Sequence, residues 1–288
     1  MTNRLVWPLL LLALLAGCSP PAQSPDSGRL EVVATTTVLA DLVAQVGGES
    51  VSVTSLVPKG GEVHTFDPSP GDVGRVAAAD LVVVNGLGLD DWAVGLARDS
   101  GTGARVLTVA DSIPAEQYIV DEETSRPNPH LWLDPSLAAG YARAIGQAIG
   151  TPDRAETYVQ ELTALQAEAR ARIGALPADA RRIVSFHDAL PYFARAFDLE
   201  IVGVVVDAPG QDPSAGEIAD LIGAIKASGV KAIFSEAQFP HDLADTVAEE
   251  TGATVVADLY TDTLGDPPVD TYGGMIRWDV DRIVEALG

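Results

Sequence analysis

The chain of 288 residues contains one cysteine, Cys18, and few basic residues. A single thiol forms neither an intramolecular disulfide nor a zinc site built from cysteines, so both are excluded. Lys and Arg number 18 against 41 Asp and Glu, for a formal net charge of -23. Because such a surface repels phosphate backbones, we expect no nucleic-acid partner. Hydrophobic residues make up 47% of the chain, which excludes a disordered protein and is enough for a large core.

The chain also lacks an apolar run of about 20 residues, the length that a membrane-spanning helix requires. The run 5–16 is shorter, follows Arg4 and is typical of a secretory signal. It leads into Leu-Ala-Gly-Cys at residues 15–18, which resembles the lipobox of bacterial lipoproteins, where the cysteine is acylated and the chain is cut before it. The alternative is an ordinary signal peptide with a coincidental cysteine. We therefore expect a lipoprotein signal peptide at 1–17, a tether at 18–29 and a membrane anchor by lipid on Cys18.

Short apolar runs alternate with stretches of helical spacing from residue 30 onward, which predicts parallel βαβ units. Thr151 to Leu176, with Pro152 at its start and Pro177 after its end, predicts a helix of nearly 40 Å at about 1.5 Å per residue. A helix of that length fits poorly inside one small domain. We therefore expect an α/β fold of two lobes with parallel sheets: an N-terminal lobe at 30–150, a linking helix at 151–177 and a C-terminal lobe at 178–288.

Only four histidines occur, and the contexts of three of them indicate a metal site. His64 follows an expected strand, His130 precedes an expected helix, and His187 lies between the expected strand 182–186 and a helix predicted at 187–197. Ligands of open α/β sheets bind beyond the carboxyl ends of the strands. Three imidazoles that converge there suit a first-row transition metal, although a lone histidine is more often structural. His241, after a proline, is expected at the solvated start of a helix instead.

A carboxylate is expected to complete the site. Asp258, Asp262 and Asp266 all follow the expected strand 254–257, and the local sequence does not choose among them. Glu236, at the end of another expected strand, is an alternative ligand or an acceptor that fixes a histidine tautomer. Four protein ligands leave little room for a catalytic water, and no His-Glu-x-x-His motif, Gly-x-Ser-x-Gly elbow or phosphate-binding glycine loop occurs. We therefore do not expect an enzyme.

Several segments, in the same order, resemble the metal-binding lipoproteins of bacterial zinc and manganese ABC importers. The resemblance covers the chain from about residue 30 to its end. The segments are HTFDPSPGDV (64–73), NPHLWLDP (128–135), SFHDALPYF (185–193), and shorter ones at 212–214, 234–239, 260–262 and 272–279. The resemblance implies metal ligands at His64, His130, His187 and Asp262, and it is what selects Asp262. It also implies a cleft for the metal between the lobes, and an ABC permease with its ATPase as partners. An extracytoplasmic location follows, and we expect a monomer.

Departures from the family pattern bear on the metal. Many zinc-type members carry a histidine-rich loop, whereas residues 112–127 of this chain are acidic, and many manganese-type members have Glu in place of His187. Three imidazoles favour zinc, which also binds more tightly than manganese to a given site. A carboxylate that binds through both oxygens would make manganese more acceptable. We expect Zn²⁺, with Mn²⁺ or both metals as the alternative.

A metal held by both lobes would stabilise the closed form that the transporter recognises, through a small tilt of the lobes. Acid should weaken binding as the histidines charge. A metal-dependent hydrolase and a surface adhesin with a structural metal are the less favoured alternatives.

Overall fold

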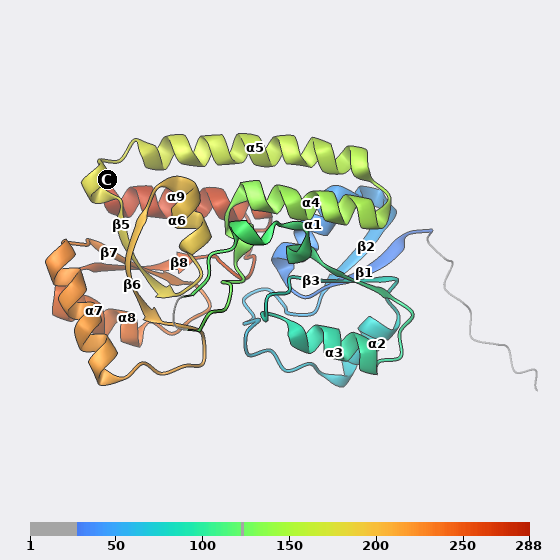
Figure 1. Ribbon diagram of the computed structural model, residues 1–288, viewed down its shortest axis with the longest axis horizontal. Coiled ribbons are helices and arrows are strands. Elements are labelled where there is room, and N and C mark those ends of the chain that lie inside the picture. The colour runs from blue at the N-terminus through green and yellow to red at the C-terminus, as the bar shows by residue number, and fades with distance from the viewer. Residues whose placement is uncertain (1–27, 122–123) are drawn as a thin grey trace, which may run out of the picture.

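The computed structural model describes residues 28–121 and 124–288, which form two α/β lobes side by side (Figure 1). Each lobe contains one four-stranded sheet, and all strand pairs in both sheets are parallel. The predicted fold of two α/β lobes with parallel sheets is therefore confirmed. The expected signal peptide and the expected lipid attachment at Cys18 lie outside the described residues.

The N-terminal sheet has the strand order β2-β1-β3-β4. Its strands are β1 (Leu30–Ala34), β2 (Val51–Ser55), β3 (Leu81–Val84) and β4 (Arg105–Thr108), and its helices are α1 (Thr37–Gly47), α2 (Pro70–Ala77) and α3 (Asp91–Asp99). Every residue of β3 is buried, as expected for a central parallel strand covered on both faces. Val82 and Val84 pack with α2 and α3, while Leu81 and Val83 belong to the cluster that contains α1. This alternation places helices on both faces of the sheet.

The C-terminal sheet repeats this topology with the order β6-β5-β7-β8. Its strands are β5 (Arg182–His187), β6 (Glu200–Val206), β7 (Ala232–Glu236) and β8 (Thr254–Leu259). The helices that follow these strands in the chain are α6 (Pro191–Phe197), α7 (Ala215–Ser228), α8 (Asp242–Thr251) and α9 (Tyr272–Leu287). In both lobes the first strand of the chain therefore lies between the second and the third.

The helices α4 (Pro135–Ile149) and α5 (Pro152–Gly174) follow the N-terminal sheet in the chain, and α5 connects the two lobes. With 23 residues, α5 is about 34 Å long and runs along both lobes (Figure 1). It contacts α1 and α4 on one side and α6 and α9 on the other. Its apolar stripe is buried, from Ala155 and Tyr158 near the N-terminal lobe to Ala169 and Ile173 near the C-terminal lobe. The helix therefore lies where the sequence predicts the linking helix.

One expected helix begins later in the structure, and one helix lies where the sequence analysis predicts none. The helix predicted from His187 begins only at Pro191, because proline favours the first helical position, and His187 is the last residue of β5. The helix α3 was not anticipated, since Gly95 interrupts its short pattern.

One hydrophobic cluster runs through both lobes without interruption. It joins Leu39 and Tyr141 of the N-terminal lobe to Leu165 of α5 and to Phe193 and Tyr272 of the C-terminal lobe. Because packed interiors resist deformation, a shared core limits how far the lobes move relative to each other. No helix in the described part of the chain is both long and apolar enough to cross a membrane.

Candidate metal centre

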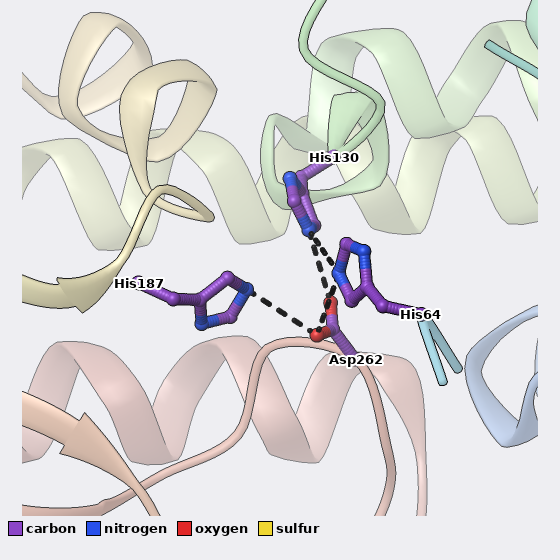
Figure 2. A group of neighbouring side chains, drawn as sticks. All are labelled: His64, His130, His187 and Asp262. Carbon is purple, nitrogen blue, oxygen red and sulfur yellow. Dashed lines mark hydrogen bonds and ion pairs between the residues drawn. The ribbon is translucent and has the colours of Figure 1, made fainter. Parts of the chain in front are cut away.

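Four segments from both lobes bring His64, His130, His187 and Asp262 together (Figure 2). His64 lies in the loop between β2 and α2, and His130 directly precedes a short 3-10 helix that leads into α4. His187 is the carboxyl-terminal residue of β5, and Asp262 lies in the loop between β8 and α9. Each lobe thus supplies two of the four side chains.

The polar atoms of these side chains face one another. Nε2 of His64 and Nε2 of His130 are 3.3 Å apart. The Asp262 carboxylate lies 3.4 Å from Nε2 of His130, 3.4 Å from Nε2 of His187 and 3.7 Å from Nε2 of His64. One polar atom of each residue lies within 4.8 Å of those of the other three.

This spacing fits a tetrahedral metal ion. Zinc bonds to nitrogen and oxygen are about 2.0–2.2 Å long, so a tetrahedral site holds its ligand atoms about 3.3–3.6 Å apart. The closest approaches in the cluster fall in or near that range. Three imidazoles and one carboxylate are also a donor set that zinc accepts. The residues present therefore fit a divalent transition metal.

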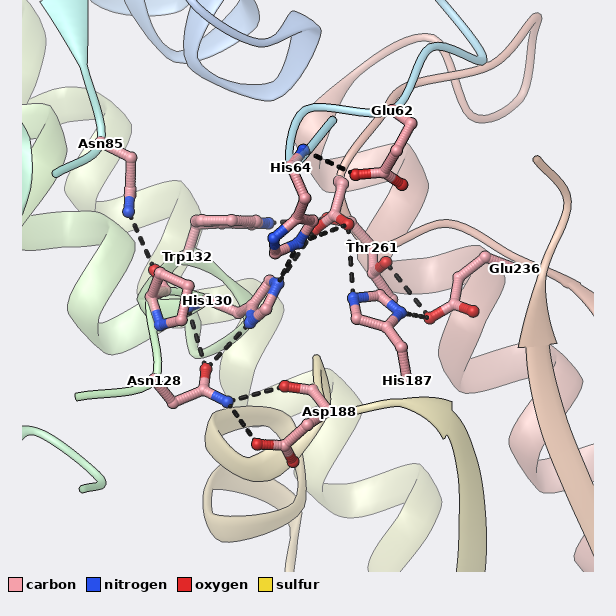
Figure 3. A network of polar contacts seen from close by, with 12 residues as sticks. Glu62, His64, Asn85, Asn128, His130, Trp132, His187, Asp188, Glu236 and Thr261 are labelled. Carbon is pink, nitrogen blue, oxygen red and sulfur yellow. Dashed lines mark hydrogen bonds and ion pairs between the residues drawn. The ribbon is translucent and has the colours of Figure 1, made fainter. Parts of the chain in front are cut away.

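Asn128 orients the imidazole of His130 (Figure 3). Its Oδ1 accepts from the backbone N–H of His130 at 3.0 Å and lies 2.9 Å from His130 Nδ1. A proton on Nδ1 leaves Nε2 free to bind a metal. The amide nitrogen of Asn128 donates to the carbonyl oxygen of Asp188 at 2.7 Å and to its carboxylate at 3.0 Å. Asn128 therefore ties the His130 segment to the residue that follows His187.

Glu236 has the corresponding role at His187. Its Oε1 lies 2.7 Å from His187 Nδ1, while His187 Nε2 faces Asp262. Both side chains are almost fully buried, with relative exposures of 0% for His187 and 2% for Glu236. Of the two roles predicted for Glu236, its position matches that of an acceptor that fixes the tautomer, and it is not part of the four-residue cluster.

Burial and charge oppose each other in this cluster. Burial favours the neutral form of His187, but the adjacent Glu236 and Asp262 carboxylates outweigh it and raise the pKa of His187 well above its usual value. Burial would raise the pKa of Asp262, yet the surrounding histidines hold it well below its usual value. Burial lowers the pKa of His130. Without a metal, the two carboxylates therefore favour the charged form of His187, and the histidines favour the charged form of Asp262.

His64 is the member of the cluster that reaches solvent. Its side chain is 17% exposed, against 3% for His130 and 0% for the other two. Glu62 accepts the backbone N–H of His64 at 2.7 Å, and Phe66 packs on Trp92 with ring centroids 4.9 Å apart. These contacts fix the loop on both sides of His64. Burial, and then the charge of Asp262, raise the pKa of Glu62.

The other candidates lie elsewhere. Asp266 is an exposed partner of Lys59 at 3.7 Å, and the Asp258 carboxylate faces Arg282 at 4.0 Å. His241 is the residue before α8, as expected, and lies outside the cluster. The sequence analysis does not single out Asn128 or Glu62. The one signal in the sequence is position, because each residue stands two places before a candidate histidine.

Comparison with known proteins agrees with this arrangement. The profile of the family described as zinc-uptake complex component A, periplasmic, matches residues 32–286. The chain is 29% identical to the manganese-binding lipoprotein MntA of Halalkalibacterium halodurans, over 97% of this chain and 96% of that protein. It is 28% identical to the metal ABC transporter substrate-binding lipoprotein SsaB of Streptococcus sanguinis, over 97% of both chains.

The solved structure of the periplasmic zinc-binding protein TroA from Treponema pallidum superposes with a TM-score of 0.83 and 28% identity. The match covers 91% of this chain and 100% of the TroA chain. The chain, with two parallel α/β lobes and one long helix along both, therefore has the fold of this metal-binding protein. The chain belongs to the zinc-uptake component A family. The family description names a component of a zinc-uptake complex, and SsaB is named as the substrate-binding lipoprotein of a metal ABC transporter.

Proposed function

We propose that this protein captures a divalent transition metal outside the cytoplasm and delivers it to the permease and ATPase of an ABC importer. The observation that carries the proposal is the meeting of three imidazole Nε2 atoms and one carboxylate, two side chains from each lobe. Because both lobes supply ligands, bound metal favours the arrangement in which they face each other. A permease that contacts both lobes would then distinguish loaded from empty protein.

Zinc is the proposed cargo. Two observations support zinc. The donor set is three imidazoles and one carboxylate, and the distances between the ligand atoms suit four-coordinate geometry. Manganese is the second candidate, because MntA is named for it and Asp262 has two oxygens facing the histidines. Two bound oxygens would raise the coordination number and suit manganese better.

Attachment to the membrane is proposed through lipid on Cys18. The residues around Cys18 resemble a lipobox, and the matching proteins MntA and SsaB are named lipoproteins. A tether would keep the metal-binding lobes near the permease. Labelling with a radioactive fatty acid tests this: the wild-type chain should incorporate label, and Cys18→Ser should not.

Competitive metal titration of residues 19–288, which include both lobes, tests the site and the metal together. Metal-free protein is titrated with zinc and with manganese in a chelator buffer, beside His64→Ala, His130→Ala and Asp262→Ala. We expect one tight zinc equivalent, far weaker manganese, and impaired binding in each variant. His241→Ala is the matched control, because it removes a histidine outside the cluster. Equal affinities would make the protein a manganese or dual-metal carrier, and tight binding by all variants would refute the ligand assignment.

A further inference from the structure

His64 lies in a loop that is anchored to the N-terminal lobe at both ends. At one end Val57 is buried, with an exposure of 1%, and at the other Phe66 packs on Trp92. Residues 58–65, between these anchors, are called the His64 loop below. Any motion of His64 relative to its own lobe therefore takes place within this loop.

A tight turn stands at the start of the His64 loop. The backbone N–H of Gly61 donates to the carbonyl oxygen of Pro58 at 2.9 Å, and Gly60 has a φ of +70°, which favours glycine. Gly60 also lines two cavities, of about 340 and about 450 Å³, so unfilled space adjoins the turn. Hinges are loop residues, often small ones, that absorb large changes in φ and ψ. Gly60 and Gly61 meet that requirement.

The hydroxyl of Thr263 holds this turn to the C-terminal lobe. Its Oγ1 accepts the backbone N–H of Gly60 at 2.9 Å and lies 3.3 Å from the hydroxyl oxygen of Thr37 in α1. The Thr37 oxygen accepts the backbone N–H of Leu264 at 2.7 Å. Thr263 is 1% exposed and directly follows Asp262. These bonds therefore join the His64 loop, α1 and the segment that carries the carboxylate of the cluster.

The Thr263 bonds do not depend on metal, because none of their atoms belongs to the four side chains of the cluster. Lys59 and Asp266 also join the turn to the C-terminal lobe, at 3.7 Å, but both side chains are exposed. Exposed ion pairs contribute little to stability. The buried bond between Gly60 and Thr263 is therefore the stronger restraint on the turn.

Metal exchange requires the His64 loop to move. His130, His187 and Asp262 are almost fully buried, whereas the His64 side chain is 17% exposed. The hydrophobic core that both lobes share limits how far the lobes part. Withdrawal of His64, the ligand on the solvent side, is thus the smallest movement that opens a path to the cluster.

We propose that Thr263 is the catch of a gate: metal enters and leaves when the bond between Gly60 and Thr263 breaks and the His64 loop lifts. The inference rests on the proposed function. The Thr263 hydroxyl acts through the position of the loop, so Thr263 is a positioning residue.

A catch has a kinetic signature. Because its bond forms with or without metal, its loss raises the population of the lifted loop in both states. Association and dissociation of metal should therefore accelerate together, with little change in Kd. A residue that only stabilises bound metal would affect dissociation alone. The two roles are therefore separable by rates.

Thr263→Val is the decisive variant, because valine keeps the branched shape and removes the hydroxyl. Zinc association and dissociation are measured by stopped flow on residues 19–288. The Trp132 ring lies 5.2 Å from that of His130, so tryptophan fluorescence responds at the site. We expect both rate constants to rise about three- to tenfold, the effect of one hydrogen bond, and Kd to change by less than about threefold. Thr263→Ser restores the hydroxyl and should return both rates to within about twofold of wild type.

Hydrogen exchange of the Gly60 amide reports on the catch directly. In metal-free protein, Thr263→Val should speed this exchange about three- to tenfold, since the amide loses its acceptor. Thr37→Val, at a partly exposed position, removes the hydroxyl that supports Thr263. It should raise both zinc rates about two- to threefold, and it provides the same test if Thr263→Val does not fold.

Thr151→Val is the matched control. It also removes a threonine hydroxyl, one that donates to the carbonyl oxygen of Val46 at 3.1 Å, at the opposite end of α1 from Thr37. It should lower the unfolding temperature and leave both zinc rates and the exchange of the Gly60 amide near those of wild type.

Faster dissociation alone in Thr263→Val overturns the proposal, because Thr263 would then stabilise bound metal without gating its exchange. Unchanged zinc rates overturn it too, whatever happens to the Gly60 amide, since metal would then use another path. Equal acceleration in Thr151→Val also overturns it, because general loss of stability would account for the effect. Failure of the proposed function looks different: wild type itself would not bind one tight equivalent of metal.

Discussion

The indole Nε1 of Trp132 donates a hydrogen bond of 2.7 Å to the backbone carbonyl oxygen of Thr261. Trp132 stands two residues after His130, and Thr261 directly precedes Asp262, so the bond joins candidate ligands of the two lobes. The hydroxyl of Tyr272 in turn donates to the carbonyl oxygen of Trp132 at 2.7 Å. Since these groups are buried, the distance between His130 and Asp262 is set without a metal.

Replacing Trp132 with Phe should weaken both stability and metal binding. The substitution leaves the Thr261 carbonyl without its donor, and an unsatisfied buried acceptor costs about 1–3 kcal/mol. Urea unfolding of the metal-free protein measures the first effect, and chelator competition measures the second. We expect zinc affinity to fall at least several-fold, because the two ligand segments lose their mutual restraint.

Trp92→Phe is the control for this prediction. Trp92 is partly buried, whereas Trp132 is fully buried, and Nε1 of Trp92 makes no hydrogen bond within the described residues. Its replacement should cost stability through lost packing on Phe66, and it should lower zinc affinity less than Trp132→Phe does, because phenylalanine keeps a ring against Phe66 beside the His64 loop. A loss of affinity as large as that in Trp132→Phe would argue against a specific role for the Trp132 bond.

Glu236→Gln should reduce zinc affinity about 10- to 100-fold at neutral pH. Groups that hydrogen-bond a metal-binding imidazole raise its basicity, and their loss has effects of that size. Glutamine preserves an oxygen acceptor for His187 Nδ1 but removes the charge that now lies 2.7 Å away. Chelator competition at constant pH measures the change. Glu285→Gln, an exposed substitution of equal charge change on α9, should have no effect.

Zinc affinity should fall as the pH is lowered, because protons compete with metal for the imidazoles. Glu236 and Asp262 together raise the pKa of His187 well above its usual value despite burial, so metal must displace a proton even near neutral pH. Calorimetry in buffers of different ionisation enthalpy should therefore detect proton release at pH 7. In Glu236→Gln the pKa of His187 is lower, so proton release at pH 7 should shrink. Equal release by both proteins would contradict the protonated His187.

Removal of metal should leave the protein folded. The hydrophobic cluster that joins both lobes is complete without an ion, and α5 packs on both. With a chelator, circular dichroism should show the same helix content and one cooperative transition. Metal at about 100 times its Kd should add about 2.7 kcal/mol of stability. Unfolding on removal of metal would instead indicate a structural ion.

The lobes should move little when metal binds. Elements that pack through a shared core shift by about 1–2 Å, and α5 spans both lobes as one helix. Spin labels on cysteines introduced at exposed Val94 of α3 and exposed Glu250 of α8 report the distance. The chain from residue 19 contains no other cysteine, so labelling is specific. A change of about 10 Å would show that the lobes close as hinged bodies.

The sequence by itself determined the two-lobed fold and most elements. Buried strands such as Leu81–Val84 are continuous apolar runs, and helices such as Ala215–Ser228 begin at a capping box, here Ser214 with Glu217. These signals are local, because they depend on hydrogen bonds and periodicity within a few residues. They also place His187 at the end of a strand, where parallel sheets bind ligands.

Only the tertiary structure decided which side chains meet. Asp258, Asp262 and Asp266 are equivalent in local sequence, yet Asp262 alone of the three faces the histidines. Asp258 lies within β8 and faces Arg282, and the loop after β8 carries Asp266 to Lys59. The roles open to Glu236 differ in whether its carboxylate faces the metal position or Nδ1 of His187, and that depends on the packing of β7 beside β5. Distances between segments far apart in the chain follow from loop paths and core packing, which no local pattern encodes.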